Sequence, residues 1–330
     1  MKTLLKKLTE TASPSGYESA IREVIRAEIS SLSTNIKVDA LGNLIVTMGK
    51  KTDNGLRVMI AAHMDEIGVI VSHVEKTGLV RFSNLGTILP QYLAGSRVVF
   101  LNGARGVINH DLPDDLHKIM PLNKHFIDVG ATSDKDCLLK IGDVGVIDRS
   151  FVDLGKRVSA KSMDDRVACA VMIETMKKIK NNPHELVFVF STQEEVQCKG
   201  ATTAAYEIEP DLGIALDVTP SLDILGIKMQ VDLGKGPAIK VRDMGMLSDP
   251  RVVNWMESTA KKNKIAYQLE VLDVGTTDAK VMQISKAGLP SGALSIPCRY
   301  VHSPSEVVDM DDVQATVNLL SALLNNPISL

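Results

Sequence analysis

Histidines and carboxylates recur in five short polar clusters of this 330-residue chain. The members that could bind metal ions are His63, Asp164, Glu195, Asp217 and His302. Two imidazoles with several carboxylates and no thiolate are typical ligands of zinc, cobalt or manganese in hydrolytic sites. Five ligands are too many for one tetrahedral ion, but they suit two divalent ions that share one carboxylate. The clusters therefore predict a two-metal hydrolase.

A pair of adjacent acids, Glu194 and Glu195, follows the continuous apolar run 186–190. Such a run is typical of a strand that is buried on both faces, and open α/β sheets place their chemistry where strands end. Neighbouring side chains there point in different directions, so one acid could bind a metal while the other faces substrate. A lone acidic pair is more often a solvated turn, and only the other clusters favour a functional role.

His63 and Asp65 stand two positions apart at the end of another apolar run, 56–62. A metal-binding imidazole usually donates its other N–H to a carboxylate, which fixes the tautomer of the ring. Asp65 could make that contact, although it could also be an ordinary turn residue. The other five histidines are weaker candidates, since four lie within 68–151 and His184 has only Glu185 beside it.

The segments that must position these clusters alternate between helical and strand patterns. We expect helices at 2–11, 17–31, 164–180, 249–263, 278–286 and 311–325, a hairpin at 36–48, and strands at 56–62, 186–190, 213–217, 237–242, 265–271 and 292–296. This alternation predicts an α/β fold with a mixed, largely parallel sheet flanked by helices. The glycine-rich segment 68–151 has short β patterns and almost no helical pattern. It predicts a β-rich domain inserted into a catalytic domain formed by 1–67 and 152–330.

The composition narrows the classes of function. A hydrophobic content of 45% and a charged content of 23% are ordinary for a globular protein. A net charge of −3 gives no reason to expect nucleic acid or a membrane as partner. No apolar run approaches the roughly 18 residues of a spanning helix, and the N-terminus lacks the apolar stretch of a signal peptide. Four cysteines without CxxC spacing favour a cytoplasmic location.

The order of the motifs is more specific than any one of them. They are HMDEIG (63–68), MDDR (163–166), QEE (193–195), LDVTP (216–220) and RYVHSP (299–304). On these motifs the chain closely resembles the tetrahedral aminopeptidase family, which includes the di-metal glutamyl and deblocking aminopeptidases. SPSGYE (13–18), DALGNLI (39–45) and TTDA (276–279) extend the resemblance over essentially the whole chain.

The resemblance implies a role for each residue of the clusters. Asp164 would bridge two divalent ions, most simply zinc or cobalt, with manganese as an alternative. The remaining ligands would be His63 and Asp217 for one ion and Glu195 and His302 for the other. Glu194 would be the general base and Asp65 the partner of His63, and the bond between Asp164 and Asp165 would be a cis peptide.

The resemblance also implies how the chain assembles. The segment 68–151 would be a PDZ-like dimerisation domain, and dimers would assemble into a hollow dodecamer that trims short peptides. The loop GVINHDLPDDLH (106–117) departs from the family pattern; this departure concerns the local assembly contacts and not the metal site.

Other interpretations remain open at this point. A deacylase that acts on a non-peptide amide could use the same ligands. An endoglucanase is disfavoured, because sugar clefts need aromatic platforms and aromatic residues make up only 4% of the chain. An inactive assembly protein would not need the complete set of ligands. Thr277 and Asp278 could line the substrate site, or they could simply cap the helix expected at 278–286.

Overall fold

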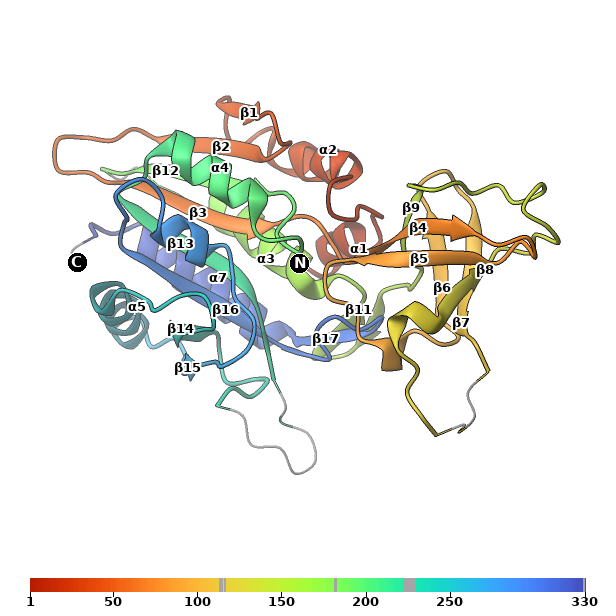
Figure 1. Ribbon diagram of the computed structural model, residues 1–330. Helices are drawn as coiled ribbons and strands as arrows, with labels where there is room; N and C mark the ends of the chain where they lie inside the picture. The colour runs from red at the N-terminus through yellow and green to blue at the C-terminus, as the bar shows by residue number, and fades with distance from the viewer. Residues whose placement is uncertain (113–114, 116, 181–182, 222, 224–229, 329) are drawn as a thin grey trace.

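The computed structural model describes residues 1–112, 115, 117–180, 183–221, 223, 230–328 and 330. Its two parts are an 11-stranded sheet covered by helices and a closed antiparallel barrel (Figure 1). The strands of the sheet are β1 (Ile36–Val38), β2 (Leu44–Gly49), β3 (Arg57–His63), β10 (Val152–Leu154), β11 (Arg157–Ala160), β12 (Glu185–Ser191), β13 (Leu212–Pro220), β14 (Ala238–Arg242), β15 (Gln268–Val271), β16 (Ser291–Arg299) and β17 (Glu306–Asp309).

The centre of the sheet is parallel and its flanks are antiparallel. The strand order is β1-β2-β12-β3-β13-β16-β17-β11-β10, and β14 joins at β16 and carries β15. The four neighbours β12, β3, β13 and β16 pair in parallel, whereas β2 and β17 run antiparallel to the strands beside them. The predicted mixed α/β sheet is therefore confirmed. Its parallel centre brings four carboxyl ends to one edge.

Helices cover both faces of the sheet. Their bounds are α1 (Lys2–Thr9), α2 (Ser19–Ile29), α3 (Met163–Met176), α4 (Lys199–Ile208), α5 (Pro250–Lys262), α6 (Ala279–Gln283) and α7 (Met310–Leu324). One large core contains buried residues of α1, α2, α3, α5 and α7, and a smaller core contains residues of α4 and α6. The molecule thus has three layers, with the sheet in the middle.

The structure explains why β12 is apolar from Leu186 to Phe190. Leu186, Phe188 and Phe190 belong to the larger core, whereas Val187 and Val189 belong to the smaller one. Because successive side chains of a strand point to opposite faces, a strand between two helical layers has no polar position. This burial holds the strand in place ahead of the two glutamates.

The barrel lies between β3 and β10 in the chain and has its own hydrophobic core. It is closed by β4 (Gly68–Val74), β5 (Val80–Leu85), β6 (Arg97–Phe100), β7 (Arg105–His110), β8 (His125–Asp128) and β9 (Val144–Ile147), with short 3₁₀ turns at Pro90–Tyr92 and Leu122–Lys124. Its likeness to a PDZ domain stays a prediction. In the divergent segment 106–117, residues 106–110 belong to β7 and are not a loop, and residues 113, 114 and 116 lie outside the described residues. Among the described helices, none is long and apolar enough to cross a membrane.

Candidate active site

The polar clusters meet at the carboxyl edge of the parallel strands. His63 is the last residue of β3, and its partner across the parallel ladder is Ser191, the last residue of β12. Glu194 and Glu195 follow β12, and Asp217 lies within β13. His302 follows β16, and Asp164 lies in the first turn of α3. The structure therefore brings together residues that are up to 239 positions apart in the sequence (302 − 63).

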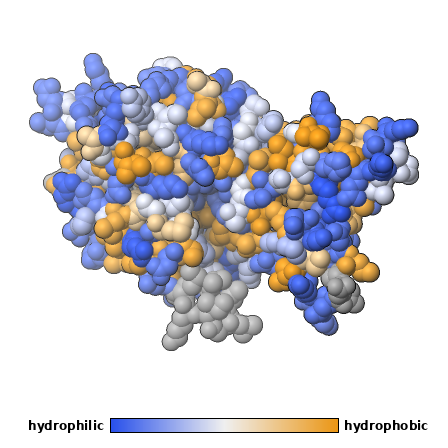
Figure 2. Space-filling model, in the orientation of Figure 1, coloured by the Kyte–Doolittle hydropathy of each residue, from blue (hydrophilic) through white to orange (hydrophobic). Residues whose placement is uncertain are grey.

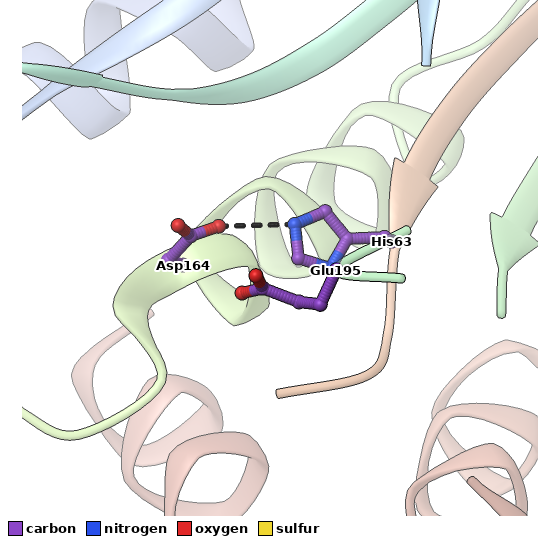
Figure 3. A group of neighbouring side chains, drawn as sticks. All are labelled: His63, Asp164 and Glu195. Carbon is purple, nitrogen blue, oxygen red and sulfur yellow. Dashed lines mark hydrogen bonds and ion pairs between the residues drawn. The ribbon is translucent and has the colours of Figure 1, made fainter. Parts of the chain in front are cut away.

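Asp164 lies between the two histidines. Its Oδ1 is 3.0 Å from Nε2 of His63, and its Oδ2 is 3.3 Å from Nε2 of His302. Nε2 of His302 is also 3.3 Å from Oε2 of Glu195. Figure 3 shows the carboxylate of Asp164 in contact with the imidazole of His63, and the carboxylate of Glu195 beside this pair. As predicted, the peptide bond between Asp164 and Asp165 is cis.

The charges in this group perturb one another strongly. Burial alone would lower the pKa of both histidines, but the neighbouring carboxylates outweigh it. They hold the pKa of His63 well above its ordinary value and raise that of His302 to about 12. Burial also opposes ionisation of Asp164, yet the two histidines keep its pKa below the usual range. Such perturbed groups gathered in one place are typical of a functional site.

Asp65 connects His63 to the two glutamates. Its Oδ1 lies 3.4 Å from Nδ1 of His63 and accepts the backbone N–H of Glu194 at 3.1 Å. Its Oδ2 accepts the backbone N–H of Glu195 at 3.2 Å and the hydroxyl of Ser15 at 2.6 Å. One buried carboxylate thus orients the imidazole and the turn that carries both acids.

The two glutamates face different neighbours. Oε2 of Glu194 lies 3.9 Å from Nε2 of His63, and its Oε1 accepts the thiol of Cys198 at 3.1 Å. Burial raises the pKa of Glu194 to about 8, although the charge of His63 opposes that rise. Glu195 instead turns its carboxylate toward His302. The sequence-based expectation that neighbouring acids diverge after β12 agrees with this geometry.

Asp165 is a member of the group that the sequence did not single out. Ligand atoms of His63, Asp165 and Asp217 lie within 4.8 Å of one another, as do those of His63, Asp164 and Glu195. The side chain of Asp165 is fully buried, and neither of its oxygens accepts a hydrogen bond within the described residues. Burial and the nearby Asp217 raise its pKa well above the ordinary value. Its position beside Asp164 in the motif MDDR was the only available signal.

Two further buried carboxylates stabilise the segments that carry the site residues. Glu306 accepts the backbone N–H groups of Asp164 at 3.0 Å and of His302 at 2.8 Å. Glu66 is paired with Lys161 at 2.5 Å and with Arg166 at 3.4 Å. Glu66 stands in the motif HMDEIG, but nothing in the sequence near Glu306 indicated its role.

A cleft of about 560 Å³ opens beside these residues. Asp164, Glu194, Glu195, Asp217 and His302 line it, and Thr87 and Leu89 form part of its wall from the barrel. The barrel also lies close to Glu195 at Gly86. A side chain at this position would clash, because an added Cβ would lie 2.9 Å from Oε2 of Glu195.

Thr277 and Asp278 are buried next to the cleft and do not line it, whereas Thr276 does. The hydroxyl of Thr277 accepts the backbone N–H of Ala279, and Asp278 makes no capping bond to α6. Their predicted contact with substrate stays a prediction.

Comparison with known proteins places the whole chain in one group. A family model described as M42 glutamyl aminopeptidase matches residues 42–319. The lysyl aminopeptidase of Pyrococcus furiosus is 34% identical over an alignment of 338 positions, which covers 97% of this chain and 96% of that protein.

Two solved structures agree with this match. An aminopeptidase from the archaeon Desulfurococcus kamchatkensis has a TM-score of 0.94 at 37% identity and covers 98% of this chain and 94% of its own. The TET1 peptidase of Pyrococcus horikoshii, which can assemble into a tetrahedron or a large octahedral shell, has a TM-score of 0.89 at 34% identity over 98% of both chains.

Proposed function

Because the chain belongs to the M42 glutamyl aminopeptidase family, we propose that it removes N-terminal residues from short peptides with two metal ions and a glutamate base. The aminopeptidase activity follows from the family. The metals, the general base and the assembly are our inference from the geometry of the site.

The observation that carries this proposal is the placement of Asp164 between two histidines. A nitrogen and an oxygen bound to one tetrahedral zinc ion are about 3.3 Å apart, given bond lengths of about 2.0 Å. The separations around Asp164 and His302 lie between 3.0 and 3.3 Å. The site also contains buried carboxylate oxygens without partners among the described residues, on Asp165 and Glu195. This donor set fits divalent metal ions.

The ligands divide between two ions as the arrangement of the side chains suggests. Asp164 would be shared, since each of its oxygens faces a different histidine. His63 and Asp217 would complete one site, and Glu195 and His302 the other. Imidazole and carboxylate ligands suit zinc or cobalt, and manganese is an alternative.

Side chains of the protein would transfer the proton and orient the catalytic groups. Bound ions of this kind lower the pKa of a water molecule and polarise the carbonyl of the scissile bond. Glu194 lines the cleft and would take the proton of the attacking water and pass it to the leaving amine. Burial raises the pKa of Glu194 above its ordinary value, which makes its carboxylate a stronger proton acceptor than an exposed glutamate. Asp65 would fix the position of His63 relative to the turn that carries Glu194 and Glu195.

Metal content and activity test the proposal together. Elemental analysis of the reconstituted protein should give two ions per chain, and Asp164→Asn should bind neither ion firmly. Activity on a panel of aminoacyl-p-nitroanilides should depend on those ions and on a free α-amino group. One ion per chain at saturation, or equal cleavage of N-acetylated substrates, would contradict the proposal.

The same panel decides between this function and the alternatives. A deacylase would prefer blocked amides to free aminoacyl substrates. For an endoglucanase the cleft offers little support, because the described residues that line it include no Phe, Tyr or Trp.

We also propose that the chain has the predicted domain division and assembles through its barrel. Residues 1–67 and 152–330 would form the catalytic domain, and residues 68–151 would pair chains into dimers and then a dodecamer. Hydrophobic residues are visible on the barrel surface in Figure 2. Leu138 and Ile141 on that part of the chain are 83% and 70% exposed. Such exposure is unusual unless a partner covers it.

Native mass spectrometry of the metal-loaded protein tests the assembly. A dodecamer is expected, and Leu138→Lys together with Ile141→Lys should reduce it to smaller species. A stable, fully active monomer would overturn this part. A cytoplasmic location, expected from the spacing of the cysteines, remains a prediction.

A further inference from the structure

A second group of potential ligands lies beside the proposed metal pair and shares none of its five ligands. Glu194, Cys198 and Asp278 each offer a ligand atom, and these atoms all lie within 4.8 Å of one another. Glu194 and Cys198 come from the turn between β12 and α4, and Asp278 from the start of α6. Glu194 and Cys198 also line the cleft, so an ion has a path to the group from solvent.

The carboxylate of Asp278 is the independent sign of a ligand. The residue is only 2% exposed, and its Oδ2 accepts the hydroxyl of Ser191 at 2.5 Å. Its Oδ1 accepts no hydrogen bond within the described residues. A buried acceptor without a partner is costly, so such an atom is rarely left bare. Asp278 does not cap its helix either, since its side chain accepts no backbone N–H at the start of α6.

The thiol of Cys198 is already close to a ligand position. Its Sγ is 3.1 Å from Oε1 of Glu194. A sulfur and an oxygen on one tetrahedral zinc ion lie about 3.5 Å apart, given bonds of about 2.3 and 2.0 Å. Cys198 is 1% exposed and precedes α4 with a φ of 52°, so its side chain is held in a defined place. For an ion to bind both side chains, the separation between sulfur and oxygen would have to widen by about 0.4 Å.

We propose that Glu194, Cys198 and Asp278 form a third cation site for a thiophilic divalent ion such as zinc or cadmium. Binding displaces the thiol proton to solvent, forms one metal–sulfur bond and two metal–oxygen bonds, and leaves a fourth position for water. The site is regulatory: an ion there occupies the carboxylate of Glu194, so excess metal inhibits the peptidase. This inhibitory half rests on the proposed function, whereas the binding itself does not.

Cadmium titration of the holoenzyme tests the binding without relying on activity. A thiolate-to-cadmium charge-transfer band should appear as one further cadmium ion binds per chain. The five ligands proposed for the metal pair contain no sulfur, so exchange at those positions gives no such band. Cys198→Ser should abolish the band. It should also lower the affinity for the additional cadmium ion by at least about tenfold, the lower end of the loss in affinity when residues around a metal site are changed.

Two further variants make the result specific. Cys137→Ser removes a half-buried thiol of the barrel and should keep the band at full intensity. Asp278→Asn should lower the affinity for the additional cadmium ion, although Cys198 is still present. A band that survives Cys198→Ser, or one that vanishes in Cys137→Ser, would overturn the site.

Activity in the same titration tests the inhibitory half. Loss of turnover should follow the growth of the band in the wild type and shift to higher cadmium concentration in Cys198→Ser. A band without loss of activity would retain the third site but reject its regulatory role. A protein with no peptidase activity before titration would instead contradict the proposed function.

Discussion

The carboxylate of Glu306 accepts the backbone N–H of Asp164 at 3.0 Å, although 142 residues separate them. Its other oxygen accepts the backbone N–H of His302. One buried acid on β17 therefore fixes the positions of two main-chain segments that carry proposed metal ligands. Ligand geometry at this site depends on a residue that is not itself a proposed ligand.

Replacing Glu306 by glutamine should weaken metal binding. Glutamine has one acceptor oxygen, so one of the two N–H groups loses its partner and the ligand it carries gains freedom. We expect a loss of roughly 10–100-fold in metal affinity, measured by competition with a chelator. Asp312→Asn is the matched control, because Asp312 also accepts two backbone N–H groups, those of Gly234 and Gly236. It should change thermal stability but not metal affinity, and an equal effect of both variants would contradict the prediction.

Replacing Glu194 or Glu195 by glutamine should have different effects on metal content and turnover. Glu194→Gln should keep both metal ions and lose turnover by about 10²–10⁴-fold, as removal of a general base does. Glu195→Gln should lose one ion instead, because its carboxylate faces His302. Elemental analysis and kcat measured on the same preparations check this. The opposite pattern would reverse the two assignments.

His302→Ala should release one ion before the other. Its imidazole pairs with Asp164 and Glu195, and among the described residues it makes no ion pair or hydrogen bond with His63 or Asp217, so the second site keeps its own ligands. Dialysis against graded chelator should show one weakened site and one near wild type. His110→Ala, on β7 of the barrel, should retain both ions. Simultaneous loss of both ions from His302→Ala would count against two separable sites.

The buried pair of Glu66 and Lys161 should matter for stability. Glu66→Gln leaves the ammonium of Lys161 buried without its partner, and breaking such a pair typically costs about 3–5 kcal/mol. Chemical denaturation measures this change. The control Glu185→Gln breaks a more exposed pair with Arg57 and should cost no more than about 1 kcal/mol.

The same pair predicts how stability depends on pH. Burial alone would raise the pKa of Glu66, but Lys161 and Arg166 hold it below its ordinary value of 4.5. The unfolded state then binds more protons in acid, so this stabilisation is present above pH 4.5 and is lost as the pH falls through the folded pKa. Glu66→Gln should flatten the acid limb of the stability curve. An unchanged acid limb would show that the pair does not contribute.

The sequence predicted those features that depend on residues close together along the chain. The apolar run before Glu194 predicted β12, and the order of the motifs predicted which side chains meet. The predicted helix 249–263 corresponds to α5, whose start is fixed by the carboxylate of Asp249 accepting the N–H of Arg251. The local pattern was sufficient for these two elements, whereas the set of side chains that meet was predicted from the family resemblance.

Other features depend on contacts that a local pattern does not contain. The short strands β10, β11 and β17 were not predicted, because three or four residues carry too little alternation to recognise. Helix α4 was also not predicted, although its residues 199–208 are apolar on one face. Glu306 and Asp165 gain their significance from backbone and side chains brought close only by the fold.

The loop from Gly86 to Leu89 belongs to the barrel, yet it touches Glu195 and forms part of the wall of the cleft. Deletion of residues 68–151 would leave all five proposed ligands in the chain while removing that wall. The shortened protein would expose its acids to solvent on one side and have nothing to confine a peptide there. An engineer who wanted a minimal peptidase would therefore have to rebuild this edge, even if every ligand were kept.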